Sequence, residues 1–370
     1  MRRVPIVVLA VGAVISAACG GQKLMVGVVV PDTGINKGYG ASIKAGIKLA
    51  LDDAVAKQSP PGIEAQYRDS ASNPEYAAKE TGELFKAGAL IVIGGATSSE
   101  ALAMIPVAES AKRVIISPSA SKPGLAESSN LFFRTVPSDE FEAVAAADFL
   151  VGPRKAKTVL VLFQQGLYSE GLLPVFTAEA EKLGAKLTAK LPIGPTDWDK
   201  AISESLGASK PDAVFICAYG EEALAALTVV RAAKVDGAIC ATSAFDTGDV
   251  VKRAGAAAEG LFVPKVKLDL DSQREPMKSF IKRFRAAHGG ANPDLFAAYG
   301  YDAALAAVGA LQGPPPKDTS ELLVHLMSLG EQQGVTGKLA FDKSGNILHR
   351  PRMHVIKNGA FEDCDPSPVS

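Results

Sequence analysis

The architecture shows most clearly in residues 89–121, whose sequence is ALIVIGGATSSEALAMIPVAESAKRVIISPSAS. Two short apolar runs, Ala89–Ile93 and Val114–Ile116, predict buried strands. Between them, apolar residues recur at helical spacing, at Ala101, Met104, Ile105 and Ala108. A strand, a helix and a second nearly continuous apolar strand indicate a parallel sheet covered by helices on both faces.

The same alternation extends along the chain in both directions. Further apolar or β-branched runs predict strands at Met25–Val30, Val159–Phe163, Ala213–Ala218, Ile239–Ala241 and Gly260–Val263. Helical spacing predicts one helix over about Tyr39–Lys57 and another beginning near Leu172. Because the alternation occurs twice, with an interruption around Phe132–Ser138, we predict an α/β protein with two doubly wound lobes.

The C-terminal part departs from this rhythm. Three helices are predicted there, at Arg274–His288, Ala297–Leu311 and Ser320–Leu329, the last with Ser320 as its N-cap. The runs Val335–Phe341 and Ile347–Lys357 predict the two strands of a hairpin. This end of the chain therefore adds helices and a hairpin to the alternating part.

Composition limits the classes of function. The chain has 370 residues, enough for two domains, and its 39 basic and 40 acidic side chains give a formal charge of −1. A nucleic-acid-binding protein would carry a clustered excess of Lys and Arg, so we expect no nucleic acid as a partner. Four Cys and four His, with no His-x-x-His or Cys-x-x-Cys pair, predict no metal site. No phosphate-binding loop pattern occurs, so we expect no nucleotide and no other cofactor.

The N-terminus has the pattern of an export signal. Two arginines precede an uncharged apolar run, Val4–Ala18, which is shorter than the ~20 residues of a membrane-spanning helix. The run ends in small residues followed by Cys19, which resembles the signal of bacterial lipoproteins, where this thiol receives the lipid. We predict a lipoprotein signal peptide over 1–18, lipidation at Cys19 and a tether over 19–23. The alternative is an ordinary secretory signal in which the Cys is incidental.

Small hydroxyl residues follow predicted strands of the first half of the chain. They lie at 31–34, 94–99 and 117–121, and in open α/β sheets ligands bind beyond the carboxyl ends of the strands, at helix N-termini. Ser98 can cap its helix and also offer its hydroxyl to a carboxylate. Each loop alone fits ordinary turn chemistry, but together they predict a carboxylate pocket of N–H groups and hydroxyls without Arg or Lys. The candidate residues are Tyr39, Thr97, Ser98, Ser119, Ala120 and Ser121.

Loops of the second half add aromatic and acidic candidates. Tyr168 and Tyr219 follow predicted strands, and such side chains can form an amphipathic wall over a small ligand. For any single Tyr, partial burial within the fold is an equally good interpretation. The loop after Ile239–Ala241 carries Ser243 and Asp246. No G-x-S-x-G elbow occurs, so nothing positively indicates a serine hydrolase.

Short motifs along the chain occur in a particular order and spacing. They are Gly38–Gly40, Tyr67–Asp69, Ile93–Ser99, Ile116–Ser121, Tyr168–Gly171, Ala257–Gly260 and Tyr299–Ala303. Together they resemble the leucine/isoleucine/valine-binding type of periplasmic binding protein, the solute receptors of branched-chain amino acid ABC importers. The resemblance covers about Met25 to Asn358.

The resemblance implies a type I periplasmic binding protein fold, in which two Rossmann-like lobes are joined by three crossovers and close on a ligand. It places residues 24–136 and 269–333 in the first lobe, 137–268 and 334–362 in the second, and 363–370 in a tail. Each lobe is then built from segments that lie far apart in the chain.

The same resemblance implies roles for the candidate residues. The ligand carboxylate would be held at Ser98, Ala120 and Ser121. The tyrosines at matching positions are Tyr39, Tyr168, Tyr219 and Tyr301. The family's acidic partner of a ligand ammonium matches Ser243 here, and Asp246 could take its place. Glu221 and Glu222 are weaker candidates for that role.

The function implied is that of a non-catalytic receptor, which captures a small carboxylate-bearing ligand and delivers it to an ABC permease. The ligand expected first is an aliphatic or branched-chain amino acid. We expect a monomer, periplasmic or at the cell surface, anchored to a bacterial membrane by lipid. Two alternatives remain, namely a ligand-sensing receptor of the same fold that binds amides or aromatic acids, and a surface hydrolase. Cys217 and Cys240 fall on neighbouring predicted strands, where a disulfide is geometrically unfavourable, so we expect buried thiols.

Overall fold

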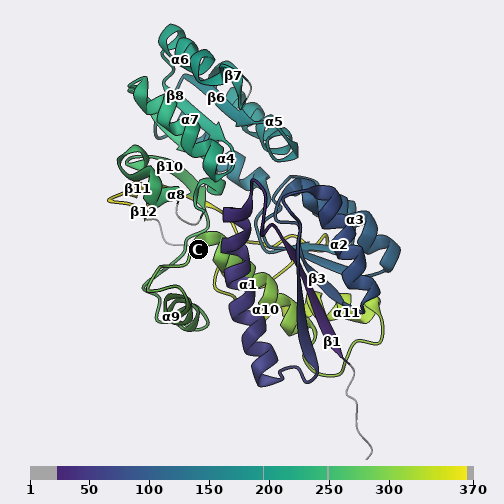
Figure 1. Ribbon diagram of the computed structural model, residues 1–370. Coiled ribbons are helices and arrows are strands. Elements are labelled where there is room, and N and C mark those ends of the chain that lie inside the picture. Colours follow the sequence, from purple (N-terminus) through teal and green to yellow (C-terminus); the bar gives the residue numbers. More distant parts are fainter. Residues whose placement is uncertain (1–22, 195, 248–249, 365–370) are drawn as a thin grey trace, which may run out of the picture.

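Two sheets organise the computed structural model, which describes residues 23–194, 196–247 and 250–364. A five-stranded sheet has the order β2-β1-β3-β4-β5, and a seven-stranded sheet has the order β12-β11-β10-β9-β8-β6-β7. Helices cover both faces of each sheet, and Figure 1 shows the second sheet standing above the first. We call the first sheet with its helices lobe 1 and the second lobe 2. The expected two-lobed α/β architecture is confirmed.

Lobe 1 opens with an alternation of parallel strands and helices. Its elements are β1 (Leu24–Val30), α1 (Lys37–Lys57), β2 (Ile63–Asp69), α2 (Pro74–Lys86), β3 (Ile91–Gly94), α3 (Ser98–Ala111), β4 (Val114–Ser117) and β5 (Phe132–Arg134). All strand pairs of this sheet are parallel. All seven residues of β1 are buried, because helices pack on both faces of this strand.

Lobe 2 repeats the alternation and then adds an antiparallel edge. Its first elements are α4 (Asp139–Val151), β6 (Thr158–Gln164), α5 (Leu167–Lys182), β7 (Lys186–Ile193), α6 (Trp198–Ser209), β8 (Ala213–Cys217), α7 (Gly220–Ala232), β9 (Ala238–Ala241), α8 (Val250–Ala254) and β10 (Phe262–Lys265). The edge consists of β11 (Arg352–Lys357), which pairs antiparallel with β10, and β12 (Ala360–Asp363), which pairs antiparallel with β11. The other strand pairs are parallel.

Three later helices return to lobe 1. They are α9 (Met277–Ala287), α10 (Leu295–Ala310) and α11 (Thr319–Met327). Figure 1 shows α9 in green and α10 in yellow-green next to the purple α1, with α11 on the far side of the strands. Helix α10 is buried along most of its length and packs directly on α1. Gly46 and Gly300 make this approach possible, since a Cβ at either position would collide with a backbone carbonyl oxygen of the other helix.

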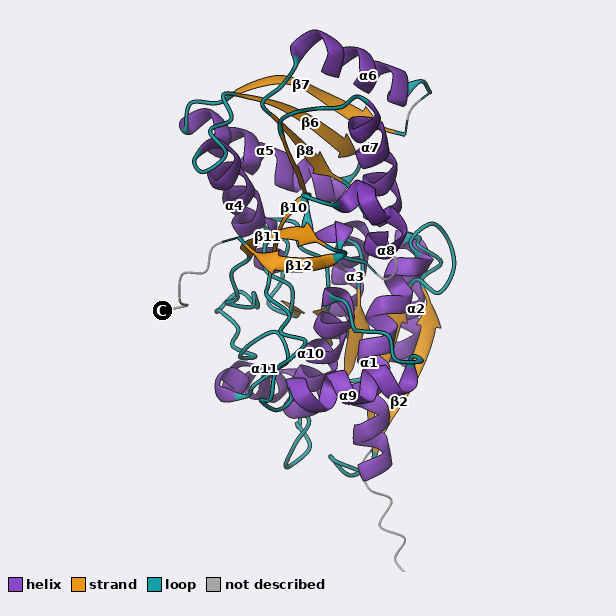
Figure 2. Cartoon of the chain, turned by 90° about the vertical axis from the view of Figure 1, so that its left-hand side faces the viewer, coloured by secondary structure: helices purple, strands orange, loops and turns teal. Residues whose placement is uncertain are grey.

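The chain crosses between the lobes at three places, after β5, after β10 and before β11. The crossing segments are residues 135–138, 266–276 and 348–351. Figure 2 shows β10, β11 and β12 at the level where the two lobes meet. The fold therefore has the three connections that two interleaved lobes require.

The expected C-terminal hairpin over Val335–Phe341 and Ile347–Lys357 forms only in part. Its two arms meet near the turn, at the isolated bridge between Phe341 and Ile347 and through the Leu348 N–H, which donates to the Ala340 carbonyl (3.2 Å). His349 also lies 2.9 Å from the Lys338 carbonyl. The regular hairpin is β11–β12. Apolar residues of the first arm pack in the core of lobe 1, so the second lobe does not resume at residue 334 as expected.

The cause is a buried carboxylate on α10. Asp302 is fully buried and accepts hydrogen bonds from the N–H groups of Val335 (2.7 Å) and Thr336 (2.9 Å) and from the Thr336 hydroxyl (2.6 Å). These bonds hold residues 335–336 to lobe 1, and the chain reaches lobe 2 only at β11.

Two further expectations concern single residues. The N-cap of α11 is Asp318 and not Ser320, because the Asp318 carboxylate accepts the N–H of Glu321. Cys217 and Cys240 are buried free thiols, as expected from their places on parallel strands, and Cys364 is also free. Cys19, the signal and most of the tail lie outside the described residues.

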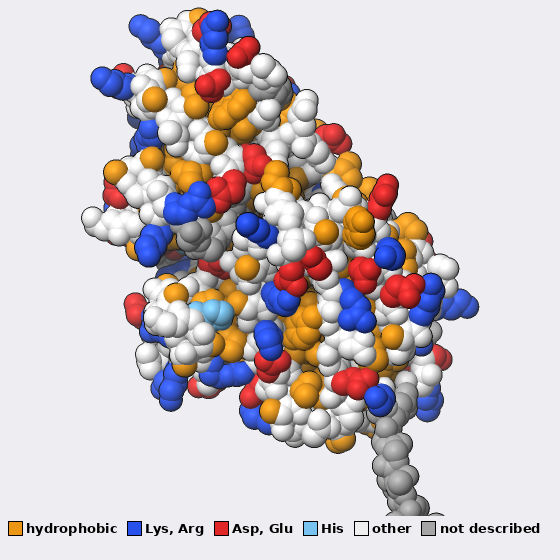
Figure 3. Space-filling model, viewed as in Figure 1, with side chains coloured by type: hydrophobic (Ala, Val, Ile, Leu, Met, Phe, Trp, Pro, Cys, Tyr) orange, Lys and Arg blue, Asp and Glu red, His pale blue; other side chains and the backbone are white. Residues whose placement is uncertain are grey.

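The surface shows no extended area of one charge on the face drawn in Figure 3, where basic and acidic side chains are intermixed. This agrees with the near-zero net charge of the chain. In the described part of the chain, none of the helices combines the length and apolarity needed to cross a bilayer.

The contact between α1 and α10 is testable with a matched pair of glycines. We expect Gly300→Ala to lower the free energy of unfolding by about 2 kcal/mol or more, because the added methyl meets the Ile43 carbonyl oxygen. Gly82→Ala, in the middle of α2, meets only the Val107 side chain at 3.5 Å and should stabilise by up to about 1 kcal/mol. Denaturant unfolding followed by circular dichroism measures both, and equal effects would show that the helix contact imposes no constraint.

Candidate functional site

Two hydroxyl-rich loops of lobe 1 lie side by side at the carboxyl ends of β3 and β4. The Ser119 hydroxyl donates to the carbonyl of Ala96 (2.7 Å), and the Lys122 N–H donates to the Ser98 hydroxyl oxygen (3.3 Å). The carboxyl ends of parallel neighbours meet at one edge of a sheet, which brings the loops together. The predicted proximity of these loops is therefore present.

Thr97, and not Ser98, caps helix α3. Its hydroxyl accepts the N–H of Glu100 (3.2 Å), and the Glu100 carboxylate accepts the N–H of Thr97 (3.2 Å) in return. The Ser98 hydroxyl is thus not used for capping. It is left at the N-terminus of a 14-residue helix, where the helix dipole favours an anion.

Three tyrosines connect the lobes. The ring of Tyr39, in α1, lies 5.6 Å from that of Tyr219, at the start of α7, and the Tyr219 ring stacks on Tyr168 of α5 at 4.9 Å. Burial raises the pKa of all three hydroxyls well above the usual range, so they are neutral donors at any physiological pH. The three predicted tyrosines therefore form one aromatic wall shared by both lobes.

The fourth predicted tyrosine, Tyr301, does not join this wall. It points into the core of lobe 1, with its ring 4.8 Å from that of Phe280. Tyr299 and Phe296 take its place, since Phe296 lies 4.6 Å from Tyr39 and 5.9 Å from Tyr299. The reason is helical geometry. Phe296 and Tyr299 are three residues apart and share one face of α10, whereas Tyr301 lies about 200° around the helix from Tyr299.

Two buried carboxylates from the first turn of α4 complete the cluster, and the sequence analysis missed both. Neither carboxylate oxygen of Asp139 has a hydrogen-bond partner among the described residues, and the side chain is 1% exposed. Burial raises the pKa of Asp139 to about 7, although the Ser121 hydroxyl, which lies near the carboxylate without the geometry of a hydrogen bond, and Arg134 act in the opposite direction. A carboxylate buried without a partner is a ready acceptor for a cationic ligand group.

Glu142 lies one turn further along α4 and reaches across to the loop after β9. It accepts the N–H (2.6 Å) and the hydroxyl (2.7 Å) of Ser243. Burial and then the charge of Asp139 raise the pKa of Glu142 to about 8. The signal that could have revealed both acids is their i, i+3 spacing at the start of a helix that is otherwise rich in Ala.

Asp246, the expected substitute partner for a ligand ammonium, is already engaged. It forms a buried ion pair with Lys265 of β10. A second cation would have to displace Lys265, which costs several kcal/mol when the ammonium stays buried. Asp246 therefore does not join the cluster, and the hydroxyl and N–H of Ser243 are committed to Glu142.

The remaining candidates converge, but they are closed off from solvent. The exposed fractions of the lobe 1 candidates are 8% for Thr97, 1% for Ser98, 5% for Ser119, 0% for Ala120 and 7% for Ser121. The Ala120 N–H donates to the Ser117 hydroxyl (2.9 Å), so this N–H is not free. A solute can reach the cluster only when the two lobes move apart.

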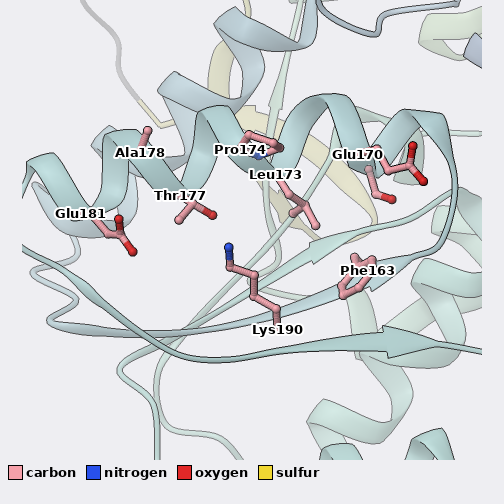
Figure 4. A pocket seen from close by; sticks show the side chains of 9 residues that line it. Phe163, Glu170, Leu173, Pro174, Thr177, Ala178, Glu181 and Lys190 are labelled. Carbon is pink, nitrogen blue, oxygen red and sulfur yellow. The ribbon is translucent and has the colours of Figure 1, made fainter.

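The open hollows of the surface lie elsewhere. One, of about 480 Å³, is on lobe 2 between α5 and the strands β6 and β7, where Lys190 points toward Pro174 and Thr177 (Figure 4). A groove of about 1620 Å³ runs between the lobes beside β10–β12 and contains Asp246. Neither contains a residue of the converging cluster. Within the described ranges, no group of His, Cys, Asp and Glu is arranged to hold a metal ion.

Comparison with known proteins places this geometry in a family context. A model of the periplasmic binding protein family matches residues 23–357. An amino acid binding protein of Pseudomonas aeruginosa is 27% identical over 334 residues, 88% of this chain and 87% of its own. Leu/Ile/Val-binding protein homolog 2 of Brucella abortus is 25% identical over 336 residues, 87% of each chain.

Two solved structures share the fold. One is the branched-chain amino acid transporter substrate binding protein LivJ of Streptococcus pneumoniae in complex with isoleucine, with a TM-score of 0.84 and 24% identity over 92% of this chain and 98% of that one. The other is a solute binding protein of R. palustris in complex with benzoate, with a TM-score of 0.82 and 20% identity over 93% and 96%. The two-lobed fold is thus known with more than one kind of ligand.

The assignment of the helix cap to Thr97 and not to Ser98 is testable in the absence of ligand. We expect Thr97→Ala to lower the free energy of unfolding by about 1 kcal/mol, because the capping box is lost. Ser98→Ala removes one long hydrogen bond and should change stability by less than about 0.5 kcal/mol. Urea unfolding of the two variants is the measurement, and the reverse order of effects would return the capping role to Ser98.

Proposed function

Because the chain belongs to the periplasmic binding protein family, we propose that it is the extracytoplasmic solute-binding receptor of an ABC importer for an aliphatic or branched-chain α-amino acid. The observation that carries this proposal is the buried cluster between the lobes. It combines uncharged donors from lobe 1 with a carboxylate, Asp139, that has no partner of its own among the described residues. A zwitterion supplies the complement of both halves.

The carboxylate of the ligand is assigned to the hydroxyls of Ser98 and Ser121. Ser98 stands at the positive end of α3, and its hydroxyl is not needed for capping. Bonds from hydroxyls to a charged carboxylate are stronger than neutral ones, and low dielectric strengthens them further. No Lys or Arg takes part in this assignment, so uncharged donors alone would bind the ligand carboxylate.

The ammonium of the ligand is assigned to Asp139. This assignment replaces the expected role of Ser243 or Asp246, because those two residues are bonded to Glu142 and Lys265. Glu142 adds a second negative charge one turn away on the same helix. The aliphatic side chain would then lie against the aromatic wall, where its burial contributes about 25 cal/mol per Å².

The enclosure of the site is consistent with a transport receptor. A ligand enters when the lobes separate and is covered when they close, and the closed form is what a permease would recognise. Cys19 would anchor the protein to the membrane by lipid, leaving the two lobes in the periplasm or at the cell surface. We retain the expectation of a monomer that acts through its permease.

An aromatic acid is the second candidate ligand, because a solute binding protein of the same fold is known with benzoate. Asp139 disfavours it, since a benzoate-like ligand has no cation and would leave this carboxylate buried and unpaired. A sensor that regulates a partner protein could use the same site. A hydrolase is the weakest reading, because no described His is hydrogen bonded to a serine of the cluster.

The ligand class can be tested by thermal shift of the purified protein. At 100 times its dissociation constant a ligand adds about 2.7 kcal/mol to stability, which raises the melting temperature by several degrees. We expect this rise with leucine, isoleucine or valine and none with benzoate. A rise with benzoate alone would overturn the amino acid proposal.

The pH dependence of binding tests Asp139. In the closed, ligand-free form, burial raises the pKa of Asp139 to about 7 and that of Glu142 to about 8, so both carry protons below neutral pH. An ammonium requires the ionised carboxylate, so binding releases a proton. The affinity should therefore rise with pH by up to about tenfold per unit below about pH 7 and level off above it, as one proton is released.

Asp139→Asn should weaken leucine binding and flatten this pH profile. Glu140→Gln, an exposed neighbour in the same helical turn, is the matched control and should leave both unchanged. Isothermal titration calorimetry in buffers of different ionisation enthalpy measures affinity and released protons together. Unchanged affinity and profile in Asp139→Asn would remove this residue from the site.

A further inference from the structure

Arg134, the last residue of β5, is the most conspicuous buried charge next to the site. Its side chain is 0% exposed, and it heads the largest fully buried side chains of the described chain. Burying a guanidinium costs several kcal/mol unless its donors and its charge are matched. The question is what this group does there.

The guanidinium is hydrogen bonded to the loop that carries Ser121. Its Nη1 donates to the carbonyl of Lys122 (2.9 Å) and, at a longer 3.4 Å, to the carbonyl of Ala120. These two carbonyls belong to the residues on either side of Ser121. The Ser121 carbonyl in turn accepts the N–H of Asp139 (2.8 Å), so the loop, the guanidinium and the start of α4 form one connected unit.

A second set of bonds fixes the direction of the guanidinium. Its Nε donates to the side-chain oxygen of Asn346 (2.7 Å). Asn346 is itself held, since its amide donates to the carboxylates of Glu127 (2.9 Å) and Asp342 (3.1 Å). The Arg134 N–H also donates to the carbonyl of Gly345 (3.0 Å). The arginine is therefore clamped by the segment that leads to the third crossover.

The charge of the guanidinium acts on the same site. The acidic groups that act on it are those of Asp139, Glu127, Glu140 and Asp342, and of these only Asp139 is fully buried. For Asp139, Arg134 is the opposite charge that favours the ionised form. Arg134 is thus hydrogen bonded to the loop that carries Ser121, and its positive charge acts on the carboxylate of Asp139.

We propose that Arg134 is a positioning residue of the ligand site, which holds Ser121 in place and balances the charge of Asp139 while Asn346 keeps the guanidinium aligned. The proposal rests on the function proposed above for the Ser121 and Asp139 pair. Arg134 does not touch the ligand in this account. It acts through the two residues that do.

The chain offers a matched control arginine in lobe 2. Arg231 donates from Nε to the carbonyl of Ala257 (3.0 Å) and from Nη2 to that of Glu259 (2.7 Å), the same bridging of two carbonyls two residues apart. It lies outside the converging cluster. Arg231→Gln and Arg134→Gln therefore remove the same kind of contact, and only the second should affect the site.

The test compares Arg134→Gln, Arg134→Lys and Arg231→Gln by leucine calorimetry at several pH values and by carboxyl NMR titration of ligand-free protein. Arg134→Gln should weaken leucine binding by about tenfold or more and move the ionisation of Asp139 to higher pH. Arg134→Lys should restore the ionisation and part of the affinity. Arg231→Gln should alter neither. A folded Arg134→Gln variant that matches Arg231→Gln in both measurements would overturn the proposal.

Two further measurements keep the inference separate from folding and from ligand choice. If Arg134→Gln does not fold, Asn346→Ala provides the test, because it keeps the charge of Arg134 and removes the bond to its Nε. It should weaken leucine binding a few fold without moving the Asp139 titration. Wild-type affinity would refute the role of Asn346 in aligning the guanidinium. If the wild-type protein does not bind leucine, the proposed ligand fails. The Asp139 titration and the amide exchange of Ser121 in ligand-free Arg134→Gln, with Arg134→Lys as the charge-retaining control, then decide the inference, and Arg134→Gln values equal to the wild type would refute it.

Discussion

The carboxylate of Asp139 is buried where the two lobes meet and has no hydrogen bond among the described residues. The other residues of the candidate site surround this carboxylate. An ionised group in such a place is costly unless opposite charge or strong donors surround it. The N-terminus of α4 and the buried Arg134 each offset part of the cost. A cationic group from outside the chain would supply the remainder.

The parallel sheets explain why this place lies between the lobes. In each sheet the parallel strands end at a common edge, and the loops that follow β3, β4 and β9 all contribute to one buried cluster. The aromatic wall from Tyr39 to Tyr168 spans the junction, so contact between the lobes and enclosure of the site are the same event. In the function proposed above, binding and closure are linked, because the rings assigned to the ligand also join the lobes.

Buried polar anchors stand next to each of the crossovers. Arg134 precedes the first, the Lys265 pair with Asp246 precedes the second, and Asp302 holds the segment that leads to the third. Each anchor fixes the chain to its lobe up to the point of crossing. Because these anchors hold the chain next to the crossing segments, we expect motion between the lobes to be concentrated in those segments.

The sequence by itself determined the alternation of strands and helices, the two lobes and the hydroxyl loops around Ser98, because hydrophobic period and loop chemistry are local properties of the chain. Tertiary structure decided which candidates meet. Tyr301 lies in the core of lobe 1 because of its position on the helix, and Asp246 forms an ion pair with Lys265. Asp139 is the carboxylate left without a hydrogen-bond partner among the described residues. Such outcomes depend on which groups lie opposite one another after folding, and neither burial nor pairing across lobes is written in local sequence.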